Sequence, residues 1–299
     1  MKILCVGHVS FDITFPVDKF PEENTKNRIN EKVECGGGPA SNAAYLLGKY
    51  GIETYFMGLI GNDFYGAQVE REFNDVNVNT EYLLKMKDYN TTVSTIIANR
   101  ENGSRTILTY KGSKVSYPIN HINFIPDIIL VDGQEIAMSN YLIDTYPKAI
   151  TIIDAGRPTK EIIELSKKVK HVVCSKEFAE EVTGLSVDYT DKKTLVAIYQ
   201  RMETIFPGNI VITLESNGCL YKINNLIKLM PSLKVSAVDS TGAGDLFHGA
   251  FTYGIAKGYD YEAVLKIANI VGALSVRKIG GRFSVPEKEE IKEYYEKFE

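Results

Sequence analysis

The residues best suited to chemistry stand together in one glycine-rich segment, Val238–Asp245. Its sequence is Val-Asp-Ser-Thr-Gly-Ala-Gly-Asp, and it lies between a β-like stretch and an apolar helical stretch. Gly242 and Gly244 allow the backbone to turn sharply and to approach a ligand closely. The N–H groups at the start of the helix then point at one spot, where the helix dipole favours negative charge. The segment therefore predicts an anion-binding loop suited to a transferring phosphoryl group.

Asp245 lies in the first turn of that expected helix, placed to accept a proton from a substrate hydroxyl. The structural alternative is that Ser240 and Thr241 cap the helix and that Asp245 only complements its dipole. The segment lacks the Lys-Ser/Thr ending of a Walker loop and the Gly-X-Gly-X-X-Gly spacing of a dinucleotide site. No Gly-X-Ser-X-Gly elbow occurs in the chain, so the sequence gives no support for a Ser-His-Asp triad.

A second glycine-rich stretch precedes an expected helix near the N-terminus. Gly37 and Gly38 again allow close backbone approach, Pro39 suits the first helical turn, and Asn42 both donates and accepts hydrogen bonds. Asp12 follows the expected first strand and is a suitable acceptor for vicinal hydroxyls. Taken alone, the glycine-rich stretch is better explained as a helix start, and Asp12 can be explained as a loop carboxylate.

The two stretches together resemble a known family. Residues 239–245, followed by Phe247 and 249–251, closely resemble the C-terminal signature of the ribokinase-like (PfkB) carbohydrate kinases. Residues 36–44 resemble the N-terminal signature of the same family, and the resemblance covers residues 2–286. It implies a three-layer α/β/α sandwich with a mostly parallel central sheet and a small β-sheet lid.

The resemblance also implies an activity: ATP-dependent transfer of the γ-phosphoryl group to a hydroxyl of a sugar or sugar-like molecule. Asp245 would be the catalytic base, and the backbone of Gly242, Ala243 and Gly244 would form the anion hole. The residues implied for the acceptor substrate are Asp12, Gly37, Gly38 and Asn42. The residues implied for the nucleotide are Thr213, Gly218, Asn269 and Gly244.

Asp132 and Glu135 follow another expected strand, at the edge where α/β sheets bind ligands, and we expect Glu135 to contact the substrate. Asp154 and Arg157 resemble a family Asp-X-X-Arg segment. Arg157 there would meet phosphate charge, or it would simply pair with Asp154.

Metal ions are implied on the nucleotide side. Mg²⁺ is expected with ATP, and backbone groups of residues 279–286 with Asp239 and Ser284 resemble a monovalent-cation site, for which K⁺ is the expected ion. The alternative for Ser284 is a turn cap. The chain departs from the family where many members have Asn-X-X-Glu, because Ser175 and Phe178 stand at those positions. Glu177 is a substitute magnesium-region residue or else a solvated carboxylate.

One other departure lies on the nucleotide side, and two alternative functions stay open. Glu215 replaces the first glycine of the family's nucleotide-side loop, so a different shape is expected for that loop. A nucleoside kinase of the same fold is the first alternative, since Phe11, Phe15 and Tyr110 could stack on a base or belong to the core. The second alternative is a non-catalytic relative that binds a sugar or nucleotide, suggested by the altered magnesium segment.

Short β-branched runs alternate with longer helical patterns, which predicts a mostly parallel sheet covered on both faces. Expected strands are 3–7, 54–60, 127–131, 150–154, 171–174 and 210–214, with a strand pair in 219–230. Expected helices are 40–50, 66–73, 138–146, 159–169, 176–183, 192–202, 243–257 and 261–278. Two segments, 12–35 and 90–112, interrupt the alternation and are expected to form the lid of a single domain, 1–299. Asn102-Gly103 between two β-branched runs predicts a hairpin in the second segment.

Bulk composition agrees with an ordinary globular protein of 299 residues, 44% hydrophobic and 24% charged. The net charge of −4 and the lack of a basic run argue against nucleic acid as a partner. No apolar run approaches the roughly 20 residues that span a bilayer. Four scattered cysteines without metal or redox spacing favour a reducing cytoplasm. A homodimer formed through the lid is expected from the resemblance.

Overall fold

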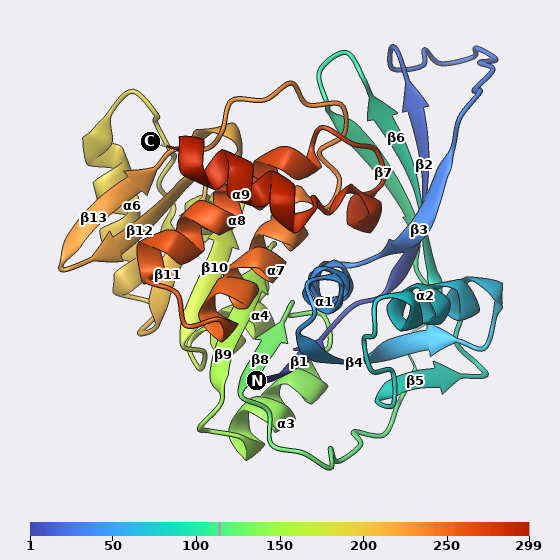
Figure 1. Ribbon diagram of the computed structural model, residues 1–299, viewed down its shortest axis with the longest axis horizontal. Helices are drawn as coiled ribbons and strands as arrows, with labels where there is room; N and C mark the ends of the chain where they lie inside the picture. Colours follow the sequence, from blue (N-terminus) through green and yellow to red (C-terminus); the bar gives the residue numbers. More distant parts are fainter. Residues whose placement is uncertain (113–114, 299) are drawn as a thin grey trace.

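A nine-stranded, mostly parallel sheet forms the centre of the chain (Figure 1). The computed structural model describes residues 1–112 and 115–298. In spatial order the strands are β13 (Leu226–Met230), β12 (Cys219–Ile223), β11 (Asn209–Thr213), β10 (His171–Ser175), β9 (Ile150–Ala155), β8 (Ile128–Val131), β1 (Lys2–Val6), β4 (Glu53–Gly61) and β5 (Leu83–Met86). Only the pairs β11–β12 and β12–β13 are antiparallel. Every residue of β8 is buried, as expected for a strand covered on both faces.

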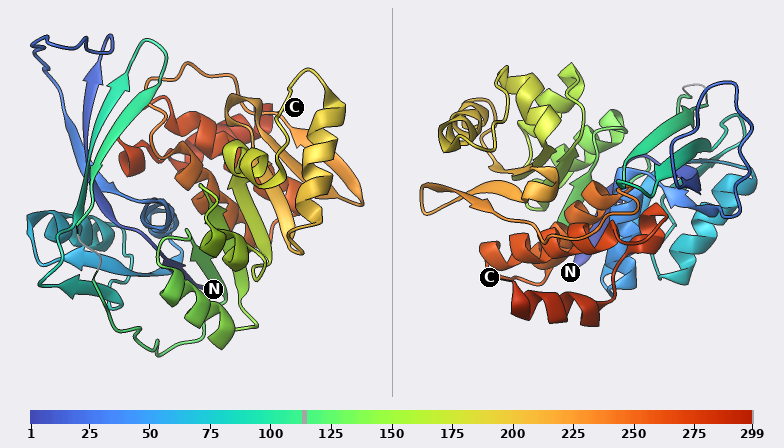
Figure 2. Two further views of the ribbon diagram at one scale, coloured as in Figure 1. Left: turned by 180° about the vertical axis from the view of Figure 1, so that it is seen from behind. Right: turned by 90° about the horizontal axis from the view of Figure 1, so that it is seen from above.

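Helices cover both faces of this sheet, and each layer has its own apolar core (Figure 2). One layer comprises α1 (Pro39–Lys49), α2 (Phe64–Asp75), α7 (Ala243–Ala256), α8 (Tyr261–Ser275) and α9 (Lys288–Lys297). The other comprises α3 (Ile136–Thr145), α4 (Lys160–Ser166), α5 (Lys176–Thr183) and α6 (Lys192–Glu203). Phe73 and Phe251 are buried in the first core, and Phe178 and Met202 are buried in the second. The three-layer sandwich expected from the sequence is confirmed.

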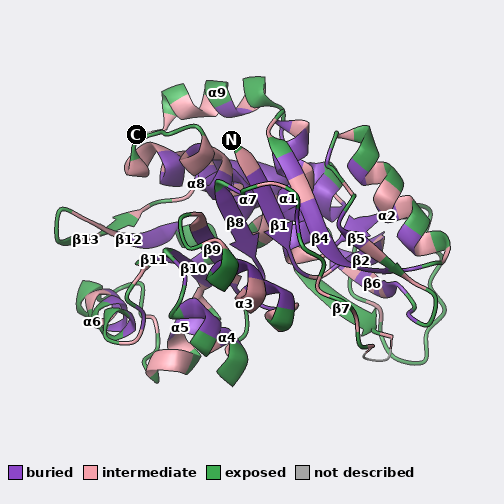
Figure 3. Ribbon diagram, turned by 90° about the horizontal axis from the view of Figure 1, so that it is seen from below, coloured by how far each residue is buried: buried purple, intermediate pink, exposed green. Residues whose placement is uncertain are grey.

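A separate four-stranded sheet projects from one side of the sandwich and forms the lid (Figure 1). Its strands lie in the order β3 (Val33–Gly37), β2 (Ser10–Val17), β6 (Thr92–Asn99) and β7 (Arg105–Tyr110), and only the central pair β2–β6 is parallel. The predicted hairpin joins β6 to β7, and Gly103 in its turn has a φ of 71°. Residues 18–32 contain no strand, so the first lid segment is a strand pair joined by a long loop. All residues of β7 are exposed (Figure 3).

The expected elements are present, with shifts of a few residues at their ends. The sequence analysis missed β5 and α9. The first has only four residues, and the second is polar over most of its surface, with Ile291 as its buried contact. No helix within the described ranges has the length and apolar character needed to cross a membrane. That the chain behaves as a single domain stays a prediction.

Candidate active site

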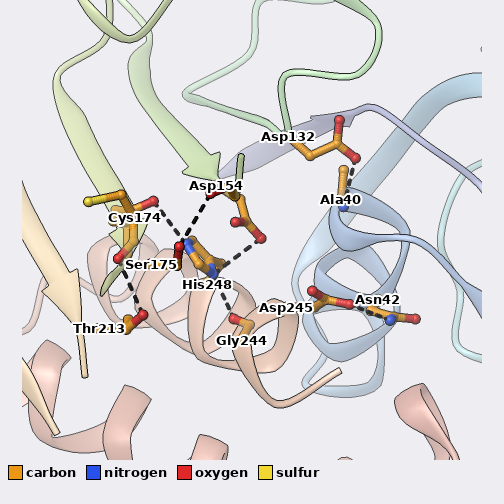
Figure 4. Close-up of polar contacts among 12 residues, drawn as sticks. Ala40, Asn42, Asp132, Asp154, Cys174, Ser175, Thr213, Gly244, Asp245 and His248 are labelled. Atoms are coloured by element: carbon orange, nitrogen blue, oxygen red, sulfur yellow. Dashed lines mark hydrogen bonds and ion pairs between the residues drawn. The ribbon is translucent and has the colours of Figure 1, made fainter. Parts of the chain in front are cut away.

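Asp245 stands in the first turn of α7, where the glycine-rich segment turns into helix. The turn depends on Gly242, the residue before the helix, which has a φ of 76°. A left-handed backbone of this kind costs a side-chain-bearing residue energy that glycine avoids. Asn42 on α1 donates from Nδ2 to Oδ2 of Asp245 at 2.7 Å (Figure 4). The structure thus brings together two residues that lie 203 positions apart in the chain.

The loop beside Asp245 has the features of an anion site. The N–H groups in the first turn of a helix lack partners within the helix and carry its positive dipole end. Gly244 is exposed, and a side chain added there would meet no atom within 4 Å. The amide of Ala243 makes only a long bond, 3.4 Å, to the carbonyl of Ser240. The backbone at Gly244 is therefore open to a ligand, as the sequence predicts for an anion hole.

The acceptor-side residues Asp12 and Gly37 lie in contact on neighbouring lid strands. A Cβ on Gly37 would lie 2.1 Å from Oδ2 of Asp12, so only glycine leaves room for this carboxylate. Asp12 accepts a hydrogen bond from the hydroxyl of Ser10 at 2.9 Å. Burial raises the pKa of Asp12 to about 6, and the charge of Asp245 adds to the increase. Asp245 therefore lies close enough for its charge to act on the Asp12 carboxyl.

Gly38 and Asp132 position the start of α1 next to this site. Gly38 precedes the helix with a φ of 99°, and a Cβ there would lie 2.3 Å from the carbonyl oxygen of His8. Asp132, at the end of β8, accepts hydrogen bonds from the amides of His8, Ala40 and Gln134. The bond from Ala40 is drawn in Figure 4. Burial raises the pKa of Asp132 to about 7. Its three backbone partners indicate a positioning role at the start of α1.

Glu135 is not brought to the residues above by any contact in the described ranges. It precedes α3 and accepts a hydrogen bond of 2.5 Å from the hydroxyl of Tyr117. Its part in substrate binding stays a prediction.

His248 connects the central sheet to the anion loop, a connection that the sequence analysis missed. Nε2 lies 3.0 Å from the carbonyl oxygen of Val173, while Nδ1 lies 2.6 Å from that of Gly244 and 3.2 Å from Oδ2 of Asp154 (Figure 4). Carbonyl oxygens only accept, so both ring nitrogens are placed to donate. Burial raises the pKa of Asp154, the opposing charge of His248 lowers it, and Asp245 raises it. The pair formed by His248 and Asp154 thus holds the first turn of α7 at the carbonyl group of Gly244.

Asp239 ties the glycine-rich segment to the closing loop, which contains the short helix η2 (Gly281–Ser284). Its Oδ1 accepts from the amide of Thr241 at 2.9 Å, and its Oδ2 accepts from the amide of Gly280 at 3.0 Å. Ser284 donates to the carbonyl oxygen of Gly281 at 2.6 Å. This contact agrees with the alternative role expected for Ser284, that of a turn cap. The hydroxyl of Thr241 is buried and makes no hydrogen bond within the part of the chain that is described.

The nucleotide-side residues form a looser arrangement. Thr213, at the end of β11, donates to the carbonyl oxygen of Cys174 at 3.2 Å (Figure 4). Glu215 begins the short helix η1 (Glu215–Asn217) with a φ of 53°. Gly218 has a φ of 96°, and a Cβ there would lie 1.8 Å from the carbonyl oxygen of Met230. The packing of the strand pair β12–β13 is therefore sufficient to explain the glycine at position 218, without a nucleotide contact.

Asn269 does not join this group. It lies inside α8 with its amide buried, donating to the carbonyl oxygen of Leu265 at 3.1 Å and to the sulfur of Cys219 at 3.3 Å. These contacts direct the amide into the core, so the nucleotide contact expected for Asn269 stays a prediction without support from its geometry.

The departures at α5 have a structural explanation. Ser175 precedes the helix and accepts a hydrogen bond from the amide of Phe178, and Phe178 packs against Phe206 in the core. Glu177 is half-exposed, and its nearest charged partner is Lys176 at 3.8 Å. The residues described here include no group of three or more His, Cys, Asp or Glu side chains that could hold a metal ion.

The tip of the lid hairpin touches the glycine-rich segment. The carbonyl oxygen of Gly103 accepts from the amide and the hydroxyl of Ser240, at 3.2 and 2.9 Å. The guanidinium of Arg105 donates to the same hydroxyl at 2.6 Å. The lid and the anion loop are thus in direct contact, which the sequence did not reveal.

Comparison with known proteins places this arrangement in a class. A family model described as pfkB family carbohydrate kinase matches residues 1–288. The chain belongs to this family, and its enzyme class is that of ATP-dependent carbohydrate kinases, as the sequence resemblance implied.

Individual relatives are distant but cover the full length. The chain is 25% identical over 302 residues to a ribokinase of Bacillus subtilis, covering 98% of this chain and 99% of the relative. It is also 25% identical over 304 residues to a nucleoside kinase of Methanocaldococcus jannaschii, covering 99% and 97%. The fold is similar to that of the Arabidopsis thaliana ribokinase solved with ribose and ATP, with a TM-score of 0.79, 19% identity and 98% of each chain covered.

Proposed function

We propose that this enzyme transfers the γ-phosphoryl group of ATP to a hydroxyl of a sugar or sugar-like molecule, with Asp245 as the catalytic base. The observation that carries the proposal is the pairing of Asp245 with Asn42 beside the open backbone of Gly244. One carboxylate oxygen, Oδ2, is held by Asn42, which leaves Oδ1 to take the proton of the acceptor hydroxyl.

The remaining residues around this base bind the acceptor or stabilise the transferring group. Asp12 accepts hydrogen bonds from hydroxyls of the acceptor, and Gly37 leaves the space for it. The N–H groups of Gly242, Ala243 and Gly244 stabilise the charge that develops on the transferring group. Each such donor is worth roughly 3 kcal/mol in the transition state.

Mg²⁺ enters as part of the MgATP substrate. Proteins bind this ion through one or two carboxylates plus substrate phosphates, so a dedicated protein cage is not required. Asp245 and Asp154 are two carboxylates near the anion loop that are candidates for this contact. Glu177 is the weaker candidate, because it is half-exposed and lies beside Lys176.

K⁺ is proposed to bind between the glycine-rich segment and the closing loop, near Asp239 and Ser284. The buried hydroxyl of Thr241, which has no hydrogen-bond partner among the described residues, supports an oxygen ligand here. Against this, both oxygens of Asp239 already accept backbone hydrogen bonds. Replacing K⁺ by tetramethylammonium in the assay tests the requirement.

The lid is proposed to exclude water and to mediate a homodimer. Strand β7 is the outer strand of the lid sheet, and Ile107, Leu108 and Tyr110 on it are exposed. An exposed apolar edge strand favours pairing with another chain. Light scattering of the wild type and of Leu108→Lys tests this: a dimer that dissociates in the variant supports the proposal, and a wild-type monomer contradicts it.

The acceptor is either a sugar or a nucleoside, since the ribokinase and nucleoside kinase relatives are equally similar. Phe11 does not favour the nucleoside, because it is buried and packs against Tyr65 at 5.2 Å. A cytoplasmic location is proposed from the four free, buried cysteines.

A panel of sugars and nucleosides with coupled detection of ADP tests the proposal, with and without K⁺. We expect one acceptor class to stimulate ADP formation and Asp245→Asn to slow it strongly. If no acceptor stimulates ADP formation, or if Asp245→Asn turns over at the wild-type rate, the proposed function is wrong.

A further inference from the structure

Arg282 is the largest charged side chain that the fold buries completely, with an exposed fraction of 0%. It belongs to η2 in the closing loop, and its guanidinium carbon lies over the rings of Tyr45 and Phe73, at 5.3 and 5.0 Å from their centres. Burying a charge is costly unless the charge is paired and hydrogen-bonded. The contacts of Arg282 therefore need a reason beyond packing.

Each nitrogen of the guanidinium has a partner from the N-terminal half of the chain. Nη1 donates to Oε2 of Glu72 at 3.1 Å, Nη2 donates to the hydroxyl of Ser41, and Nε donates to Oδ1 of Asn42 at 3.4 Å. Gly36 makes room for the group, because a Cβ there would lie 2.4 Å from Nη1. Oε2 of Glu72 also accepts from the amide of Gly36 at 2.8 Å. The contacts join the closing loop, α1, α2 and lid strand β3.

The contact with Asn42 has a consequence for Asp245. A guanidinium has only donors, so the carbonyl side of the Asn42 amide must face Arg282. The amide is planar, and its NH₂ side then faces Asp245, as the 2.7 Å bond requires. Asn42 is 2% exposed, so water cannot easily replace either contact.

We propose that Arg282 is a positioning residue for Asp245, acting by fixing the orientation of the Asn42 amide. The inference rests on the proposed role of Asp245 as the base. With the amide fixed, Oδ2 of Asp245 is always occupied, and Oδ1 is presented to the acceptor. Without Arg282 the amide is free to turn, and Asp245 loses its partner.

The first test is Arg282→Lys. Lysine keeps the positive charge for Glu72 but lacks the planar set of donors that serves three partners at once. We expect kcat to fall about 10- to 100-fold, the cost of a misplaced reacting group, with KM for ATP unchanged. Arg277→Lys is the matched control, because Arg277 pairs with Glu290 at 3.2 Å on the exposed surface. It should keep wild-type kinetics. A folded Arg282→Lys enzyme with wild-type kcat overturns the inference.

A second variant covers the case in which Arg282→Lys does not fold. The double variant Arg282→Met with Glu72→Gln removes both charges of the buried pair, and such replacements are often neutral or stabilising. Gln also keeps an oxygen for the amide of Gly36. We expect a folded enzyme with the same 10- to 100-fold loss in kcat. Wild-type kcat in this variant overturns the inference.

A third measurement needs no activity and separates this inference from the proposed function. The side-chain amide of Asn42 is followed by NMR in the wild type and in the double variant. We expect its Nδ2 signals to be distinct and slowly exchanging in the wild type, and shifted with faster exchange in the variant. Unchanged signals refute the role of Arg282 even if Asp245 is the base. A wild type that phosphorylates no acceptor refutes the proposed function, while the NMR result still reports on Arg282.

Discussion

The acceptor side and the nucleotide side of the candidate site are built in different ways. On the acceptor side, Asp12, Asn42 and Arg282 are buried polar residues with specific hydrogen-bond partners. Ser10 on the same strand holds Asp12, whereas the partners of Asn42 and Arg282 come from distant segments. On the nucleotide side, the side chains of Glu177 and Glu215 are 53% and 64% exposed, and their ion-pair contacts with Lys176 are long, at 3.8 and 3.9 Å. The first arrangement depends on exact side chains, whereas the second can rely on backbone N–H groups that most sequences supply.

This difference predicts how the two sides respond to substitution. A buried network tolerates little change, because removing one member leaves another unsatisfied. An exposed carboxylate is screened by water and is worth little in either direction. We therefore expect large effects from changes on the acceptor side and small effects from changes on the nucleotide side.

The largest effect is expected for Asp245→Asn. The amide cannot accept the proton of the acceptor hydroxyl, so kcat should fall by about 10²- to 10⁴-fold, the usual contribution of a positioned base. KM for both substrates should change little. Steady-state kinetics measures both values. Asp260→Asn, a change at an exposed aspartate before α8, is the control. A loss that appears only in KM would show that Asp245 binds the substrate without acting as base.

Gly37→Ala tests the close packing on the acceptor side. The added Cβ would lie 2.1 Å from the Asp12 carboxylate and must displace it. We expect KM for the acceptor to rise about tenfold or more, as for a misplaced binding group, with KM for ATP unchanged. Gly272→Ala is the control, because a Cβ there would be no closer than 3.5 Å to its neighbours. An unchanged KM for the acceptor would remove Gly37 and Asp12 from the acceptor site.

The ionisation of Asp12 gives a pH dependence. Burial raises its pKa to about 6, so Asp12 is mostly ionised at pH 7.5 and only about one tenth ionised at pH 5. The ionised form accepts hydrogen bonds from hydroxyls, and KM for the acceptor should therefore rise as the pH falls below 6. Acceptor binding measured by calorimetry from pH 5 to 8 checks this. In Asp12→Asn, binding should be weaker and this dependence should disappear; its persistence would assign it to another group.

The same contrast shows what the sequence could predict. Residues 238–245 and 36–44 carry their signals in local spacing, so the helix starts and the mostly parallel sheet around them were predictable, and the anion loop stays a prediction. Arg282, Glu72 and the pairing of His248 with Asp154 were not, because each is defined by contacts between segments far apart in the chain. A signal for Arg282 was present in the three consecutive glycines, since Gly36 and Gly37 leave space for Arg282 and Asp12 respectively.

The nucleotide side was harder to predict, because the residues expected to contact the nucleotide are also required for packing in the core. Gly218 is required by the close approach of Met230, and the Asn269 amide is satisfied inside the core. Phe178 belongs to the core as well. Local sequence similarity cannot distinguish such packing from ligand contacts.

The smallest effect is expected for Glu215→Gly on the nucleotide side. Glu215 has a φ of 53°, where a residue with a Cβ is strained and glycine is not. Relief of this strain stabilises the folded protein, but glycine also has greater freedom in the unfolded chain, which offsets part of the stabilisation. The free energy of unfolding should therefore rise by at most about 1 kcal/mol. Thermal unfolding measures the change, and kcat and KM for ATP should stay at wild-type values.

Asn225→Gly, in the turn between β12 and β13, is the control for Glu215→Gly. Asn225 has a φ of 62°, but asparagine tolerates this conformation, so its gain in stability should be smaller. Equal gains would mean that the strain at Glu215 is not specific to its side chain. A KM for ATP that changes severalfold in Glu215→Gly would show that this carboxylate acts on the nucleotide, and the contrast between the two sides would then be wrong at this position.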